Sequence, residues 1–296
     1  MKIAGKPKLY GINSYFLIAL FAGIILYGYG NANYPETETS DDELDLYEAL
    51  LLSTHVVAVS ISFIIAKQFW GTGEKVFQKA YTALAIGMLG NLIGWTLWFY
   101  FEIYDPSVEG NPYPYWNDLA FLVWHAGALT HLRLTTHRFQ PKLHPKQLFV
   151  LFIIPSVITG FYVIFYSGET FVMDEQGRLQ FDPYGIKIEF YEECNQLCFV
   201  ASIVFIFLNP LMFSYALIGF SVFKKSTLGP AWLLLILGLG LTVFADIPYY
   251  YSELFGGYER EHWYTMFYFA SPTIMAYALY KHRDLRKAKP ETKPPE

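Results

Sequence analysis

Long apolar stretches recur along the whole sequence, and each is long enough to cross a lipid bilayer. About 20 apolar residues make one helical span. Charged residues are only 16% of the chain, whereas they make up about a quarter of an average soluble domain. The sequence therefore predicts an all-α, polytopic transmembrane helical bundle of about eight spans. The predicted spans are residues 12–30, 49–67, 80–101, 116–134, 147–166, 196–222, 229–251 and 263–280.

Basic residues alternate between the two sets of loops that these spans define. One set, which includes both chain ends, holds 18 of the 21 Lys and Arg residues, and the opposite set holds only Arg178, Lys187 and Arg260. Because basic loops stay on the cytoplasmic side, we expect a multi-pass cell-membrane protein with cytoplasmic N- and C-termini. Residues 1–280 form one transmembrane domain, and 281–296 form a short basic cytoplasmic tail. The net charge of −5 argues against a nucleic-acid partner.

The first span has a second interpretation. Three lysines, the apolar stretch 14–29 and the small residues around Gly30 also resemble a signal peptide with its cleavage site. Cleavage would leave seven spans and an external N-terminus. We favour an uncleaved helix, and the other spans keep their direction in either case.

Two segments of the sequence are similar to each other. Residues 90–133 and 241–281 each contain a span, an aromatic run, a glutamate at the outer boundary, a loop, a tryptophan and a second span. Four spans separate the equivalent helices, so the two copies have the same orientation. This pattern predicts a parallel 4+4 repeat, as in some transporters.

A short segment, Pro114-Tyr115-Trp116-Asn117-Asp118-Leu119-Ala120-Phe121-Leu122, resembles a motif of prokaryotic multipass sensor modules, which precede diguanylate cyclase or histidine kinase domains. Residues 245–249, Ala-Asp-Ile-Pro-Tyr, resemble a second motif of the same modules. The chain departs from that pattern because it carries no output domain, and because it has Trp124-His125 where the modules have an apolar or Tyr-Pro pair. The resemblance implies a ligand- or membrane-sensing module that is not an enzyme.

Several polar side chains fall at membrane depth, where they are costly and are usually functional. Asp246 lies inside the seventh span between apolar neighbours. His55 and His125 lie at similar depths in two inward-running spans, and Asn91 and Asn209 occupy the middle of two others. If these residues face inward, they line one outward-facing cavity together with residues at its rim. The candidate ligand-binding residues are Asp246, His55, His125, Asn91, Asp118, Glu102, Glu253 and Tyr249.

Three functions are compatible with these sequence features. The first is a sensor-like or accessory protein that binds a small ligand or lipid in the outward-facing cavity and acts through a separate membrane or cytoplasmic partner. The second is a small secondary transporter that uses Asp246. The third is a metal- or haem-binding protein, because two histidines and a carboxylate can hold a metal and histidines can ligate haem iron; His55, His125 and Asp246 are the candidates. The two histidines also offer a pH-sensing pair.

Overall fold

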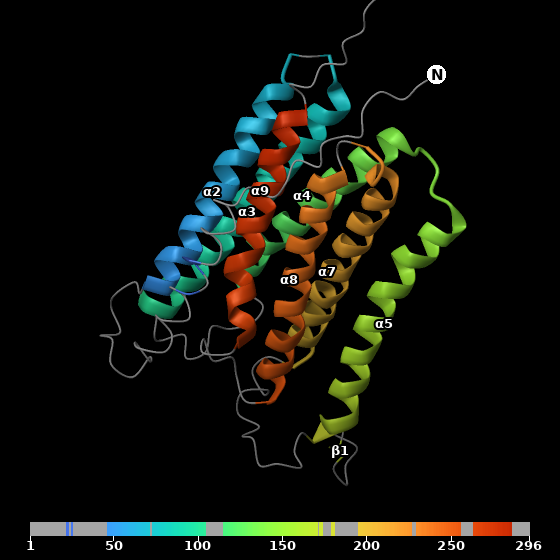
Figure 1. Cartoon of the computed structure of the whole chain (residues 1–296). Coiled ribbons are helices and arrows are strands. Elements are labelled where there is room, and N and C mark those ends of the chain that lie inside the picture. Colours follow the sequence, from blue (N-terminus) through green and yellow to red (C-terminus); the bar gives the residue numbers. More distant parts are fainter. Residues whose placement is uncertain are drawn as a thin grey trace, which may run out of the picture.

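The computed structural model is a bundle of long helices (Figure 1). It describes residues 22–23, 25, 46–71, 73–104, 115–170, 172–173, 179–180, 195–226, 229–255 and 263–285. The long helices are α2 (Leu46–Phe69), α3 (Lys75–Tyr104), α4 (Trp116–Phe139), α5 (Pro145–Thr170), α7 (Asn195–Phe223), α8 (Gly229–Phe255) and α9 (Met266–Leu285), which follows the short 3₁₀ helix η1 (Trp263–Thr265). A hairpin of two-residue strands, β1 (Val172–Met173) and β2 (Leu179–Gln180), lies between α5 and α7.

The predicted all-α architecture is confirmed, and each of the seven long helices overlaps one predicted span. The first predicted span, 12–30, lies outside the described residues apart from positions 22, 23 and 25. The full count of eight therefore remains a prediction. Among the described helices, five are long and apolar enough to cross a membrane: α2, α3, α5, α7 and α8.

Helix α4 is less hydrophobic than these five because its polar side chains point into the protein. Asn117, Asp118, His125, His131 and Thr136 are all buried. Helix α5 shows the opposite pattern, since its large apolar side chains are exposed, including Phe149, Phe152, Phe161 and Ile164. A face of this kind is stable in lipid but not in water. The two helices together identify the interior and the lipid-facing surface of a membrane bundle.

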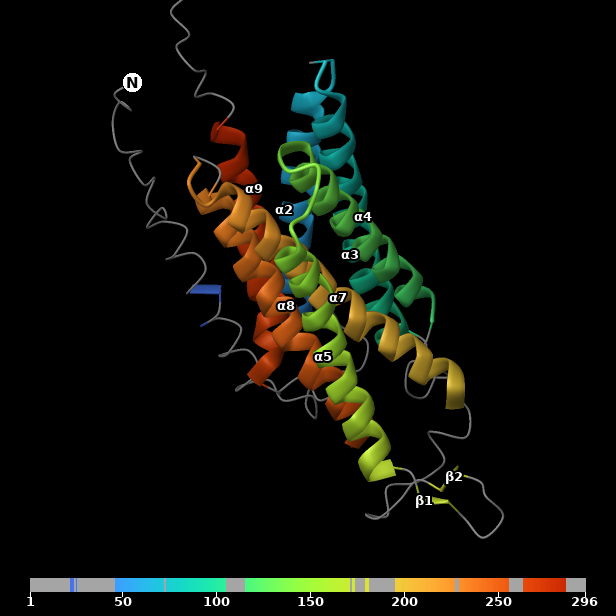
Figure 2. The same ribbon diagram turned by 90° about the vertical axis from the view of Figure 1, so that its right-hand side faces the viewer.

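Six of the helices form a closed ring. Successive contacts join α2 to α3, α3 to α4, α4 to α7, α7 to α8, α8 to α9, and α9 back to α2. Helix α5 packs mainly against α7, outside this ring; it lies at the right-hand edge of the bundle in Figure 1 and in front of the other helices in Figure 2. In the predicted repeat, α2, α3 and α4 correspond to α7, α8 and α9. The ring places these partners opposite each other, as a parallel repeat requires, although the duplication itself remains a prediction.

Helices α3 and α4 approach each other closely at their glycines. A Cβ atom on Gly127 would lie 2.4 Å from the carbonyl oxygen of Ala83 and 2.6 Å from the Cα of Gly87. One on Gly90 would lie 2.8 Å from the carbonyl oxygen of Ala120. Small residues permit this contact, and Gly90 and Gly94 have the four-residue spacing typical of membrane helix pairs. The glycines therefore hold α3 and α4 together as one unit.

Basic residues gather at the end of the bundle where α2, α4, α7 and α9 end, in the upper part of Figure 1. Inside this end the ring is filled by aromatic and histidine side chains. The Trp232 ring stacks on Phe223 at 5.0 Å between centroids. The Tyr81 hydroxyl and Nδ1 of His282 share a hydrogen bond of 2.7 Å. Nδ1 of His131, which is 1% exposed, hydrogen-bonds the Ala80 carbonyl. This packing fills the interior at the basic end.

Candidate functional site

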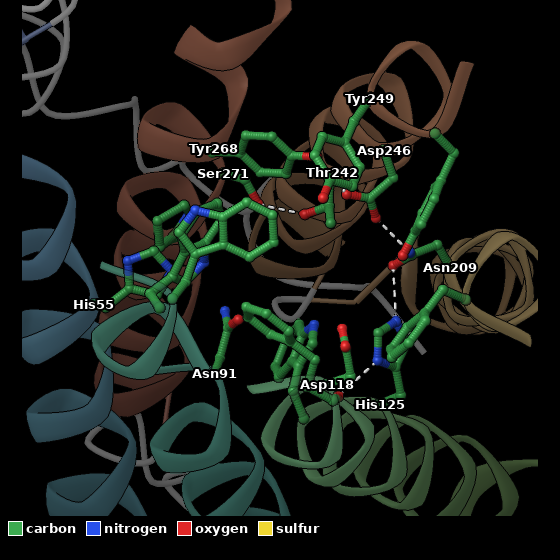
Figure 3. Close-up of a pocket in the computed structure, with 17 residues that line it drawn as sticks. His55, Asn91, Asp118, His125, Asn209, Thr242, Asp246, Tyr249, Tyr268 and Ser271 are labelled. Atoms are coloured by element: carbon green, nitrogen blue, oxygen red, sulfur yellow. Dashed lines mark hydrogen bonds between the residues drawn. The ribbon is translucent and has the colours of Figure 1, made fainter. Parts of the chain in front are cut away.

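A cavity lies inside the ring, towards the end opposite the basic residues. All six ring helices contribute side chains to it, and Figure 3 shows these side chains converging from α2, α3, α4, α7, α8 and α9. Its volume is about 80 Å³, counted as the space open to the centre of a water molecule. One water needs roughly 10–15 Å³ on this measure. The cavity therefore has room for several waters or a small organic molecule.

Helical spacing explains how each element presents its residues. On α3, Asn91, Trp95 and Trp98 follow an i, i+4, i+7 pattern, which places them on one helix face. On α4, Asp118, Phe121 and His125 have an i, i+3, i+7 pattern, and on α8, Thr242, Asp246, Tyr249 and Tyr250 continue the same rule. The sequence therefore encodes the cavity lining through polar and aromatic residues that recur at helical intervals within apolar spans.

A chain of hydrogen bonds crosses the cavity wall from α4 to α9. Nδ1 of His125 lies 2.7 Å from the Phe121 carbonyl oxygen, and its Nε2 lies 3.1 Å from Oδ1 of Asn209. Nδ2 of Asn209 donates to Oδ2 of Asp246. The Tyr268 hydroxyl donates to Oδ1 of Asp246 over 2.8 Å. Both carboxylate oxygens of Asp246 are thus engaged, and the chain links four helices (Figure 3).

His55 approaches the cavity from the other side (Figure 3). Its Nδ1 lies 2.8 Å from the Leu51 carbonyl oxygen one turn earlier on α2. Its ring contacts Trp95, with 6.1 Å between the ring centroids. His55 is 2% exposed. Its main-chain hydrogen bond fixes the ring, and its location separates it from the chain that contains His125.

Asp118 lies at the start of α4, where it has a structural role in addition to lining the cavity. The Tyr115 backbone N–H donates to Oδ2 of Asp118 over 2.6 Å, so the side chain belongs to the N-terminal cap of α4. A carboxylate in the first turn also interacts favourably with the helix dipole. Asp118 therefore combines capping with a negative charge at one edge of the cavity.

The structure brings together most of the predicted site residues. The cavity is lined by six of them: Asp246, His55, His125, Asn91, Asp118 and Tyr249. Glu102 and Glu253 belong to the last turns of α3 and α8, and their side chains lie outside the described part of the chain. A ligand-binding role for any of these residues remains a prediction.

Several lining residues had only a weak signal in the sequence. Asn209 stood out only as a polar residue in mid-span, and nothing in the sequence linked it to Asp246. Tyr268 and Ser271 are one turn apart on α9, and their three-residue spacing was the available signal. Three tryptophans, Trp95, Trp98 and Trp124, line the cavity, although such residues ordinarily mark the membrane boundary.

The metal and haem interpretations have no further geometric support. Among the residues that the structure describes, no group of three or more His, Cys, Asp or Glu side chains is placed to hold a metal ion. His55 and His125 are each tied to a carbonyl of their own helix.

No family model matches this sequence, and no curated protein or solved structure matches it. The similarity to prokaryotic sensor modules therefore rests on the two short motifs alone. One of the two includes Asp118 and the other includes Asp246 and Tyr249, all of which line the cavity.

Proposed function

We propose that this protein binds a small, positively charged ligand in the cavity and acts as a sensor-like membrane protein through a separate partner. The observation that carries the proposal is the composition of the cavity wall. Two carboxyl groups, Asp118 and Asp246, line it together with His55 and His125, and none of the described lining residues is Lys or Arg. Two ionised acids outweigh one protonated histidine. A cavity with this charge balance favours a cation over an anion or an acidic lipid headgroup.

Aromatic rings supply the second part of the recognition. The ring faces and edges that line the cavity come from three tryptophans, two phenylalanines and three tyrosines. Aromatic faces attract cations, most strongly where water is excluded, and cages of such rings recognise quaternary ammonium groups. The combination of acids and aromatic rings in a small cavity therefore favours an organic ammonium ion, which matches both the charge and the apolar surface.

The orientation follows from the charge distribution. Basic residues lie at the end of the bundle that the packed cluster around Trp232 fills, and the cavity lies towards the other end. With the basic end in the cytoplasm, the cavity faces outward, to the side on which the sequence also predicts the acidic loops 31–48 and 167–195. A ligand would reach the site from outside, and the basic loops and tail would face a cytoplasmic partner.

A second candidate function is a secondary transporter, and the prolines favour it. Pro210, Pro248 and Pro272 lie inside α7, α8 and α9. Pro210 directly follows Asn209, and Pro272 itself lines the cavity. Proline interrupts the helical hydrogen bonds, and transporters place such interruptions at their substrate sites. Uptake of labelled ligand into proteoliposomes separates the two functions, because a sensor binds the ligand but does not accumulate it.

Intrinsic fluorescence tests the proposed ligand class. Three of the seven tryptophans line the cavity, so an occupant will change their emission. We expect choline to bind at least about 10-fold more tightly than its uncharged isostere, in which carbon replaces the quaternary nitrogen, because a buried cation–π contact is worth about 2 kcal/mol. Equal affinity for the charged and uncharged compounds would contradict a cation site.

A further inference from the structure

We infer that Asn209 makes His125 and Asp246 a single proton-binding unit, in which one proton is held by either the imidazole or the carboxyl group. The inference rests on the hydrogen-bond directions across α4, α7 and α8. It requires no ligand, so it stands or falls independently of the proposed function.

His125 has a hydrogen-bond partner at each of its two ring nitrogens. Its Nδ1 faces the Phe121 carbonyl oxygen at 2.7 Å, and a carbonyl can only accept. Nδ1 therefore carries a hydrogen. In a neutral imidazole the other nitrogen, Nε2, is then an acceptor. The charge state of His125 is consequently decided by the atom of Asn209 that faces Nε2.

Asn209 presents one donor and one acceptor in opposite directions. With Nδ2 donating to Asp246, Oδ1 faces Nε2 of His125 at 3.1 Å. Two acceptors would repel, so Nε2 must also carry a hydrogen. In this arrangement His125 is an imidazolium and Asp246 is a carboxylate. The amide lies between them as a neutral bridge and is hydrogen-bonded at both ends.

Half a turn about the Cβ–Cγ bond of Asn209 exchanges its oxygen and nitrogen. Nδ2 then donates to Nε2 of a neutral His125, and Oδ1 accepts a hydrogen from a protonated Asp246. The number of protons is unchanged, because the one lost by Nε2 is gained by the carboxyl group. The Tyr268 hydroxyl can donate to the other carboxyl oxygen in both arrangements. Both keep every hydrogen bond and are electrically neutral.

Other proton counts are less favourable. With no shared proton, Nε2 and the carboxylate both require a donor from Asn209, which can satisfy only one of them. With two protons, one on Nε2 of His125 and one on Asp246, the unit carries a positive charge. The Tyr268 hydroxyl must then accept the carboxyl proton instead of donating to Asp246. Unpaired polar groups and net charge are both costly in a buried site; His125 is 4% and Asn209 3% exposed.

The surrounding titratable groups belong to the same cavity. His55 on α2, Asp118 on α4, Tyr249 and Tyr250 on α8, and Tyr268 on α9 line it, whereas α3 and α7 contribute no titratable side chain to the lining. Of these, Tyr268 hydrogen-bonds directly to Asp246. The neighbours shift the balance between the two arrangements but do not change the donor–acceptor rule that Asn209 imposes.

A consequence follows if the proposed function also holds. A cation that binds nearer to Asp246 than to His125 favours the ionised carboxylate, so it moves the shared proton to His125 and fixes one orientation of the Asn209 amide. A ligand can shift a two-state element only through its different affinity for the two states. Here the difference is the charge on Asp246. The amide is thus a switch between α4 and α8 that ligand charge can set.

The test is to measure both protonation states in the same ligand-free, full-length protein. Isotope-edited NMR gives the imidazolium fraction of His125, with the signal identified by its loss in His125→Gln. Infrared spectroscopy gives the protonated fraction of Asp246, identified by the band lost in Asp246→Asn. We expect the two fractions to sum to one throughout about pH 5–8. A sum that rises towards two or falls towards zero within this range overturns the inference.

Substitution of the bridge provides a second test. In Asn209→Leu, which has similar size and no amide, the two groups should titrate separately, and the sum should vary with pH. Asn117→Leu is the matched control, since Asn117 is also buried but does not line the cavity, and its sum should stay at one. A constant sum in Asn209→Leu would also overturn the inference. If Asn209→Leu does not fold, the sum of the two protonated fractions in the wild-type protein tests the inference by itself.

Discussion

Replacing Asp246 by asparagine should weaken choline binding by at least about 30-fold, which corresponds to about 2 kcal/mol. Asp246 is the carboxylate at the centre of the hydrogen-bond chain, and its two oxygens accept from Asn209 and Tyr268. Asparagine keeps the shape: its oxygen can accept from the Tyr268 hydroxyl, and its NH2 group can donate to Asn209 once the Asn209 amide turns to present its oxygen. The substitution therefore removes the charge with little change in packing. Tryptophan fluorescence of the cavity measures the effect.

Asp118→Asn provides the graded comparison. Asp118 also lines the cavity, but one of its oxygens accepts the Tyr115 N–H in the cap of α4. Its substitution should weaken choline binding less than Asp246→Asn does, and it should lower the thermal stability by weakening the cap. Equal losses of affinity in the two variants would show that overall negative charge, and not the position of Asp246, determines binding. Unchanged affinity in Asp246→Asn would contradict its assignment to the site.

Replacing Gly127 by alanine should destabilise the bundle by about 1–3 kcal/mol, the usual cost of overpacking a close contact. The added methyl group would lie 2.4 Å from the Ala83 carbonyl oxygen and 2.6 Å from the Gly87 Cα. Both are backbone atoms, so no side-chain rotation can relieve the contact, and α3 must move away from α4. Thermal unfolding in detergent measures the loss.

Gly160→Ala is the matched control for this change. Gly160 also lies inside a long helix, α5, but a Cβ atom there meets nothing within 4 Å. Alanine has the higher helix propensity, so this variant should be as stable as the wild type or slightly more so. A loss of stability in Gly160→Ala equal to that in Gly127→Ala would attribute the effect to helix conformation, and would contradict a tight contact between α3 and α4.

The sequence was most informative where physical constraints are local. A helix must satisfy its own backbone hydrogen bonds in lipid, so apolar length alone predicted the seven helices that the structure describes. The alternation of basic residues predicted that successive helices run in opposite directions, and the structure gathers the C-terminal ends of α2, α4, α7 and α9 at one end of the bundle. The side of the membrane that this end faces remains a prediction. Asp246 and His125 were identified because charge and imidazole are unusual at membrane depth.

The contacts between helices could not be derived in the same way. They depend on the rotation of each helix about its axis, which similar apolar faces leave undetermined. Depth alone placed His55 and His125 together, whereas the structure places them on different sides of the cavity. Asn209 joins His125 to Asp246 across segments that are 84 and 37 residues apart in the chain. These three residues come together because the six helices close into a ring.

The proposed occupant of the cavity is a small cation. Native mass spectrometry of the protein, purified gently from its own membranes, tests it most directly. We expect one bound small molecule whose mass identifies an organic cation, present in the wild type and absent from Asp246→Asn. A bound anion or lipid, a small molecule retained equally by Asp246→Asn, or a protein partner with no bound small molecule would contradict the claim.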